Sequence, residues 1–336
     1  KLSKIGNALS NSIAKYYDNN PIAKKVAVEN QYFNFKIAVK DDPIIYKLIP
    51  NLKNLEPINL TGNYNSVNGS IVLKGSIPKL VYGENTITNA ILDVANKDSA
   101  LAYSLIIDDI QNKQFQLPFT SISGKVERNI LDYTVQLKDA KEKERFLIAG
   151  TLKSIDGNNE VSLEPSNLVL NYESWKIDAE NVISIGKKGI YVGDFDLSKA
   201  GSHIIVQSES KAVNAPIAID FKDFDINTLT SFVEKSDLQL SGKINGNAKV
   251  KDLSTKPLFT SDLNITDFAF KKDTVGNISV NVNNTIPNQY DAKIAITGQG
   301  NQVNLEGIYR AELSSFNLNL DIEKLNLKSI QGFTLG

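Results

Sequence analysis

The sequence has no cysteine, no methionine and a single histidine among its 336 residues. The lack of Cys excludes disulfides, thiolate nucleophiles and Cys-ligated metals, and it leaves the redox compartment open because an oxidising space does not require cysteines. With only His203, multi-histidine metal sites and most Ser-His relays are excluded as well. From the missing initiator Met we expect that the chain begins inside a longer protein, so that a signal peptide or a membrane anchor could have been removed.

Long apolar runs and an excess of charge of one sign are also missing. No stretch approaches the roughly 20 apolar residues that a membrane-spanning helix needs. Lys and Arg total 37 against 38 Asp and Glu, so there is no net field to draw the chain to nucleic acid. Because 41% of the residues are hydrophobic and 22% are charged, the chain has enough apolar surface to fold. We expect a folded protein without a nucleic-acid partner.

The dominant pattern of the sequence is an alternation of apolar and polar residues. It is clearest in "FNLNLDIEKLNL" (316–327), where the apolar residues from Phe316 to Ile322 face one way and the Asn, Asp and Glu between them face the other. Similar runs recur along the chain and are separated by Gly, Asn, Asp and Pro. Continuous apolar strands between helices, typical of parallel sheets, are not seen. The pattern predicts a mainly β protein with a largely antiparallel sheet that has one apolar face and one wetted face.

Only a few short helices are predicted. The best candidate covers residues 1–17, where apolar residues recur at spacings of three and four and can cover the end of a sheet. Binding to a membrane surface is an alternative role for it. Shorter helices are predicted within 42–50, 227–235 and 328–333.

The chain contains degenerate repeats. "FDINTLTSF" (224–232) aligns with "LNLKSIQGF" (325–333), and "LTGNYNSVNGSIVLKGSIPKL" (60–80) aligns loosely with the segment that begins at Gly242. Self-similarity of this kind indicates units that stack on their neighbours in a quasi-linear body.

Together, these repeats resemble the AsmA-like family, and within it the TamB-type subunits of the translocation and assembly module. The resemblance is strongest in 220–336, looser in 42–84, and reduced to the alternation alone in 85–215. Ser261 occupies a position that is often Gly in the family. The pattern is carried by Gly242, Ile244, Gly246, Ala248, Val250, Pro257, Phe259, Leu263, Ile265, Asp267, Phe268, Phe270 and the following "VGNISVNVNN" (275–284).

The resemblance implies an elongated sheet curled into a U-shaped, β-taco-like groove with an apolar interior. It further implies a segment of a bridge-like protein in the periplasm of a Gram-negative cell, from the Bacteroidetes. Such a protein carries phospholipid between the inner and outer membranes, assists outer-membrane protein assembly, or does both. The implied partners are an acyl-chain lipid and a BamA/TamA-like outer-membrane barrel, the latter through a region beyond these residues. An inner-membrane anchor, also absent from this chain, is implied as well.

On this basis we divide the chain into three segments. Residues 1–20 are an amphipathic helix or linker, 21–215 a β-groove segment with degenerate repeats, and 216–336 a β-groove segment with the best family-like repeats. The residues predicted to line the lipid groove are those on the apolar side of the alternation. They are Leu131, Tyr133, Val135, Leu137, Ile217, Ile219, Phe221, Ile244, Ala248, Val250, Leu263, Ile265, Ile278, Val280, Val282, Ile294, Ile296, Val303, Leu305, Phe316, Leu318, Leu320 and Ile322.

Two other interpretations are open at this point. The same alternation would fill the core of a closed sandwich or solenoid, in which case the protein is a non-catalytic scaffold or an adhesion module. The adjacent carboxylates Asp41/Asp42 and Asp108/Asp109 could serve acid/base catalysis, but such pairs more often decorate turns. We therefore expect no enzymatic activity, no cofactor and no metal, and a structural role for His203.

Overall fold

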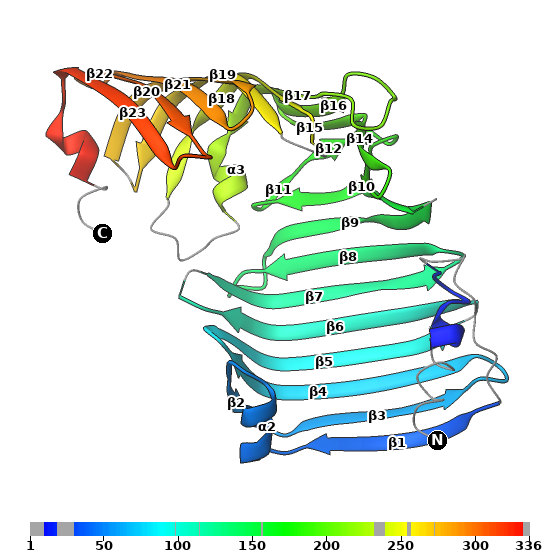
Figure 1. The fold of residues 1–336 in the computed structure, drawn as a ribbon. Helices are drawn as coiled ribbons and strands as arrows, with labels where there is room; N and C mark the ends of the chain where they lie inside the picture. The colour runs from blue at the N-terminus through cyan, green and yellow to red at the C-terminus, as the bar shows by residue number, and fades with distance from the viewer. Residues whose placement is uncertain are drawn as a thin grey trace. The chain divides into compact units, whose positions relative to one another are not determined.

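The structure is a computed structural model that describes residues 10–18, 30–97, 99–113, 115–155, 157–231, 239–253, 257–271 and 273–331. The chain divides into two compact units, residues 1–173 and 174–336. Each unit is built on an antiparallel sheet (Figure 1).

Unit 1 is a meander in which nearly every strand pairs with its predecessor and its successor. The strands follow the order β1-β3-β4-β5-β6-β7-β8-β9-β10, and β2 pairs with the end of β4. Several of these strands bend along their length (Figure 1). The elements are β1 (Tyr32–Val39), α2 (Pro43–Leu48), β2 (Leu52–Leu55), β3 (Ile58–Asn65), β4 (Ser70–Tyr82), β5 (Asn85–Lys97), β6 (Ala100–Gln111), β7 (Gln116–Glu127), β8 (Ile130–Lys138), β9 (Glu144–Ile155) and β10 (Asn158–Leu170), with the short β11 (Glu173–Ser174) at the unit boundary.

Unit 2 contains a second meander, with the order β12-β15-β16-β17-β18-β19-β20-β21-β22-β23. The hairpin of β13 with β14 precedes β15 in the chain and belongs to the first sheet, not to this meander. The elements are β12 (Lys176–Ile177), β13 (Val182–Gly186), β14 (Gly189–Gly193), β15 (Phe195–Lys199), β16 (Ser202–Ser208), β17 (Ile217–Asp225), α3 (Ile226–Thr230), β18 (Leu240–Lys251), β19 (Leu258–Phe270), β20 (Asp273–Ile286), β21 (Gln289–Gly298), β22 (Asn301–Arg310), β23 (Ser315–Lys324) and the 3₁₀ helix η1 (Leu327–Ile330).

The predicted fold class is confirmed: the protein is mainly β, its sheets are antiparallel, and its helices are few and short. Neither sheet closes on itself, because the first and last strands of each order do not pair with one another. The predicted segment boundary at 215/216 does not coincide with a boundary between compact units. It lies inside unit 2, where β16 and β17 pair directly from Ser208 opposite Ile217 onward, and the structure divides the chain at 173/174 instead.

The three short predicted helices form, and they begin in the same way. Asp42, Asp225 and Asn326 are the N-cap residues of α2, α3 and η1, and each side-chain oxygen accepts a hydrogen bond from the backbone N–H two residues later. Such a cap satisfies an N–H that has no partner within the helix. In the alignment of 224–232 with 325–333, Asp225 matches Asn326, so the repeated sequence encodes a repeated cap. Residues 232–235 and 332–333 of the predicted helices lie outside the described residues.

The described part of the amino-terminal segment packs against the sheet of unit 1. Residues 1–9 lie outside the described residues, and residues 10–13 are helical. Tyr16 packs against the buried cluster of Tyr64, Ile71 and Leu101. The Tyr64 hydroxyl lies 2.8 Å from the Ser12 hydroxyl, and this contact fixes the segment on the sheet.

Candidate functional site

The register of unit 2 gathers the predicted lining residues on one face of its sheet. In an antiparallel ladder, directly opposite residues point to the same face, and so do residues two apart along a strand. One row across the strands joins, in order, Leu197, Ile204, Phe221, Gly246, Leu263, Val280, Ile294, Leu305 and Leu320. A parallel row joins Phe224, Ile244, Ile265, Ile278, Ile296, Val303 and Ile322. We call this surface the apolar face of unit 2.

Much of the apolar face of unit 2 is only partly covered. Four of the predicted lining residues are buried, namely Ile217, Ile244, Ala248 and Val303. Most of the others are half-buried. At the edge, β23 exposes Phe316 by 70%, Leu318 by 55%, Leu320 by 57% and Ile322 by 48%. A side chain between two packed sheets would be largely removed from water, so this part of the face is not the inside of a filled sandwich.

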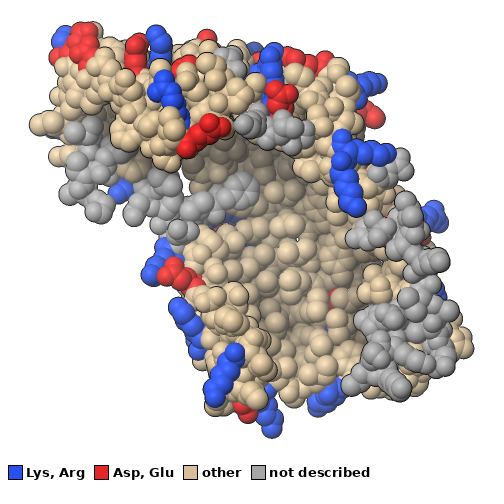
Figure 2. All heavy atoms as spheres, viewed as in Figure 1, with Lys and Arg blue, Asp and Glu red and all other residues tan. Residues whose placement is uncertain are grey.

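Unit 1 has an equivalent surface. The predicted residues Leu131, Tyr133, Val135 and Leu137 alternate along β8 and are all half-buried. The row through Val135 joins Ile37, Leu60, Gly75, Leu92, Leu105, Ile122, Val135 and Ile148. No charged residue occurs in this row. Figure 2 shows the same lack of charge over the face of β4–β9 that is turned to the viewer, with Lys, Arg, Asp and Glu at its margins. We call it the apolar face of unit 1.

Tyrosine rings lie over glycines in a neighbouring row of this face. Tyr103 is opposite Gly124, and Tyr133 is opposite both Gly124 and Gly150. A Cβ on Gly150 would lie 2.6 Å from the Tyr133 Oη. The Tyr103 hydroxyl donates to the Asp132 backbone carbonyl at 2.9 Å. The Tyr103 hydroxyl thus has a backbone hydrogen-bond partner within the sheet, and its ring adds apolar area to the surface.

Burial raises the pKa of Tyr103 and of Tyr133. The neutral phenol is therefore favoured in the folded state, and the stabilisation is complete below the unfolded value of about 10 and lost as the pH rises above it. We expect the free energy of unfolding of unit 1 to fall as the pH is raised above about 10, measured by urea titration with far-UV circular dichroism. The double variant Tyr103→Phe/Tyr133→Phe keeps both rings and is expected to lose less stability over this range; an equal loss would contradict this explanation.

The Asp267-Phe268 pair of the family-like pattern is a β-bulge, and so is the similar Asp223-Phe224 pair. Asp223 and Asp267 have φ of 44° and 51°, and the register shifts at both positions. The following rings are buried, with Phe224 at 0% and Phe268 at 9% exposure. A bulge re-aims the side chain that follows it. The pair therefore places an aromatic ring at the margin of the apolar face of unit 2, beside α3.

Asparagine side chains hold these bulges in place. The Asp223 N–H donates to Asn245 Oδ1 at 2.9 Å, and the Asp267 N–H donates to Asn277 Oδ1 at 3.1 Å. Each Asn lies on the next strand, so the extra backbone donor created by the bulge finds a partner there.

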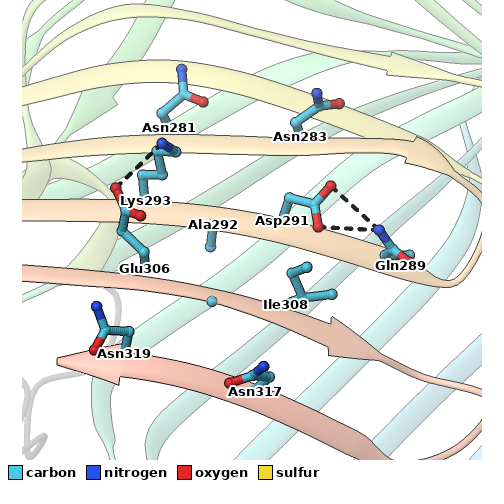
Figure 3. A pocket seen from close by; sticks show the side chains of 11 residues that line it. Asn281, Asn283, Gln289, Asp291, Ala292, Lys293, Glu306, Ile308, Asn317 and Asn319 are labelled. Carbon is cyan, nitrogen blue, oxygen red and sulfur yellow. Dashed lines mark hydrogen bonds and ion pairs between the residues drawn. The ribbon is translucent and has the colours of Figure 1, made fainter.

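The opposite face of unit 2 is polar and carries a hollow of about 500 Å³. Figure 3 shows its side chains rising from several neighbouring strands, with Lys293 paired to Glu306 at 3.2 Å. Gln289 donates to Asp291 at 3.2 Å. The hollow is lined mainly by Asn281, Asn283, Gln289, Asp291, Lys293, Glu306, Asn317 and Asn319. These groups can hydrogen-bond, but no nucleophile with an adjacent base is among them.

The carboxylate pairs have structural partners. Asp42 caps α2, and Asp41 accepts a hydrogen bond from the Tyr46 hydroxyl at 2.6 Å. Asp108 accepts one from the Asn89 side chain at 2.7 Å, and Asp109 one from Gln116 at 3.1 Å.

His203 lies on the polar face of unit 2, with Nδ1 at 3.3 Å from Asp196 Oδ1 on the neighbouring strand. Among the described residues, no group of three or more His, Cys, Asp or Glu side chains is placed to hold a metal ion. The structural role of His203 stays a prediction from the sequence.

The fold and its surfaces define a class: an antiparallel β protein with an uncharged apolar face on each of two sheets. No protein-family model matches the chain, and the searches of curated proteins and of solved structures also found no match. In the part of the chain that the structure describes, none of the helices has the length and apolar character needed to span a membrane. The resemblance to AsmA-like proteins therefore stays a prediction from the sequence pattern.

Most of the apolar face of unit 1 is not among the residues predicted from the sequence. The predicted residues of this unit all lie in β8, although β1 and β3–β7 supply the same rows. The signal was present, because "FNFKIAV" (33–39) alternates as clearly as the carboxy-terminal strands. The sequence signal for the bulges and for the rings over glycine is weaker. At a bulge the alternation is interrupted, and at a ring over glycine one of the apolar positions is occupied by a small residue.

Proposed function

We propose that the chain is a segment of a periplasmic, bridge-like protein that carries phospholipid along its apolar faces between the inner and outer membranes. The observation that supports this best is the continuous, uncharged and incompletely covered face on each sheet. An additional role in outer-membrane protein assembly, with a BamA/TamA-like barrel as partner, belongs to the same proposal because the resemblance implies it.

The energetics of lipid transfer favour such a surface. Moving an acyl chain of about 16 carbons into water costs on the order of 13 kcal/mol, at about 0.8 kcal/mol per methylene. An apolar face largely avoids this penalty at every position along the path. Because the rows run across the strands, each strand adds one side chain to each row, and the lining extends as strands are added.

Lipid transfer along an apolar face also requires that no fixed polar groups lie on the path of the acyl chain. A buried carboxylate or ammonium would hold some headgroups too tightly and would be unsatisfied in front of an acyl chain. The charged residues of β23 all lie on the polar face, as Asp321 illustrates by pairing with Asn304. An acyl chain lying on the apolar face would therefore meet no charge along this strand.

A closed scaffold or adhesion module was the alternative. It requires the lining residues to interdigitate at the density of a protein core. Exposure of 48–70% along the apolar row of β23 favours the lipid-carrying alternative.

The proposal is tested by the lipid content of the purified chain and by one charge-introducing variant. Native mass spectrometry is expected to find phospholipid bound to the chain. Leu318→Asp is expected to lower bound lipid and vesicle-to-vesicle transfer by on the order of tenfold, because a carboxylate then faces the acyl chain. Folding should persist, since Leu318 is 55% exposed.

Asn317→Asp is the matched control, because it adds the same charge to the same strand on the opposite face. It should bind and transfer lipid like the unaltered chain. A chain that purifies without lipid and transfers none from vesicles would contradict the proposal. If instead Leu318→Asp unfolds, the packed-core alternative is supported.

A further inference from the structure

The last described strand of unit 2 lies at an edge of its sheet. Within the described residues β23 pairs with β22 and with no other strand. Each residue of β23 after Ser315 is exposed. A strand in this position offers a row of backbone N–H and C=O groups to any strand that can lie beside it.

From Phe316 to Ile322 this edge lacks most of the features that protect edge strands against pairing, and its register shift with β22 comes only after Ile322. Natural edge strands are blunted by Pro, by a charge pointing into the apolar face, or by being very short. β23 has ten residues and contains no Pro. Its inward residues are Phe316, Leu318, Leu320 and Ile322, so no charge guards the apolar side.

The first strand of unit 1 has the complementary chemistry. Within the described residues β1 pairs only with β3. Its apolar residues, including Phe35 and Ile37, lie on the apolar face of unit 1, and Lys36 lies between them on the polar side. Among the described residues, β1 thus has an unpaired edge and a single central cation.

Neighbouring strands of both sheets pair a lysine with a carboxylate directly opposite on the polar face. The distances are 3.5 Å for Lys74–Asp93, 3.8 Å for Lys125–Asp132 and 3.2 Å for Lys293–Glu306. Lys36 of β1 and Asp321 of β23 have no ion-pair partner among the described residues.

We propose that β1 of one copy of the chain pairs with β23 of a second copy, with Lys36 facing Asp321. In this register the residues that flank Lys36 meet the apolar residues that flank Asp321. The backbone ladder and the apolar face then continue from one copy into the next. The contact joins two different surfaces, so it generates end-to-end chains or rings. This inference goes beyond the proposed function and does not depend on lipid binding.

Sedimentation velocity of the 336-residue chain over a wide concentration range tests the association. The sedimentation coefficient is expected to rise with concentration. Leu320→Lys places a charge on the apolar side of the edge and should weaken association at least about tenfold. Asn319→Lys adds the same charge on the polar face of the same strand and should associate like the unaltered chain.

A charge exchange tests the register. Lys36→Asp and Asp321→Lys should each weaken association, because like charges then face each other between identical copies. An equimolar mixture of the two variants should restore it, because every contact between unlike copies places opposite charges at positions 36 and 321. The double variant, which has the opposite sign at both ends, should associate like the unaltered chain. A double variant as weak as the single variants would overturn the proposed register.

The absence of cysteine allows a direct test of contact between copies. A mixture of the single variants Lys36→Cys and Asp321→Cys should form mixed disulfide dimers on oxidation, whereas Lys36→Cys mixed with Lys293→Cys, in the middle of the sheet, should form far fewer. Mixed dimers would support the pairing even if Leu320→Lys fails to fold. A chain that stays monomeric at all concentrations and gives no excess of mixed dimers would overturn the proposal.

Discussion

Truncation of Phe224 is expected to destabilise unit 2 by about 3–5 kcal/mol, because the Phe224→Ala change leaves a large cavity. Phe224 is fully buried, at 0% exposure. Its ring centroid lies 5.6 Å from that of Trp175 and 5.9 Å from that of Phe221. The ring therefore supports the aromatic cluster at the margin of the apolar face.

The single tryptophan makes this effect easy to measure. Trp175 is 3% exposed, so its emission should be blue-shifted in the native state and should shift to the red as unit 2 unfolds. Urea titrations followed by this emission give the free energy of unfolding of unit 2. Phe316→Ala is the matched control, because Phe316 is 70% exposed, and it should change stability by less than about 0.5 kcal/mol. Equal effects of the two truncations would contradict the aromatic cluster as a source of stability.

The second large effect is expected in unit 1, at a glycine beneath a tyrosine ring. An added Cβ at Gly150 would overlap the Ser162 carbonyl oxygen on β10 and approach the Tyr133 Oη to 2.6 Å. The overlap is with backbone on one side, so a rotamer change alone cannot relieve it. We expect Gly150→Ala to lower the free energy of unfolding by about 3 kcal/mol, the upper part of the usual range for overpacking.

Gly75→Ala provides the comparison within the same sheet. A Cβ there would lie 3.3 Å from Leu60 Cδ1 and 3.4 Å from Leu92 Cβ, contacts that small side-chain movements can accommodate. We expect a change of less than about 1 kcal/mol. Far-UV circular dichroism during urea unfolding measures both variants. A Gly75→Ala variant as unstable as Gly150→Ala would show that the loss comes from alanine in a strand in general.

The alternation along each strand predicted the class of fold and most of the apolar face of unit 2. The prediction succeeded because successive side chains of a strand point to opposite faces. Any short stretch of sequence therefore shows which of its residues share a face. Phe316, Leu318, Leu320 and Ile322 were assigned from sequence to the face on which the structure places them. The short helices were predictable for a similar local reason, since an Asx cap and the residues that follow it are close in sequence.

Other features depended on contacts between distant residues. The division at 173/174 depends on how contacts between distant residues are distributed along the chain, and no composition change marks it. The bulges at Asp223 and Asp267 require an Asn acceptor 22 and 10 residues away. A single strand cannot reveal such a partner, because alternation describes each strand by itself.

What the sequence alone determined was therefore the identity of the two faces, because the direction of a side chain in a strand depends only on its place in the alternation. Only the tertiary structure decided how much of each apolar face is covered. Coverage depends on which elements come to lie on it, such as α3 and the segment around Tyr16, and these contacts join residues that are far apart in the chain. The partial exposure of the apolar row on β23, which underlies both proposals, is therefore a property that only the tertiary structure decided.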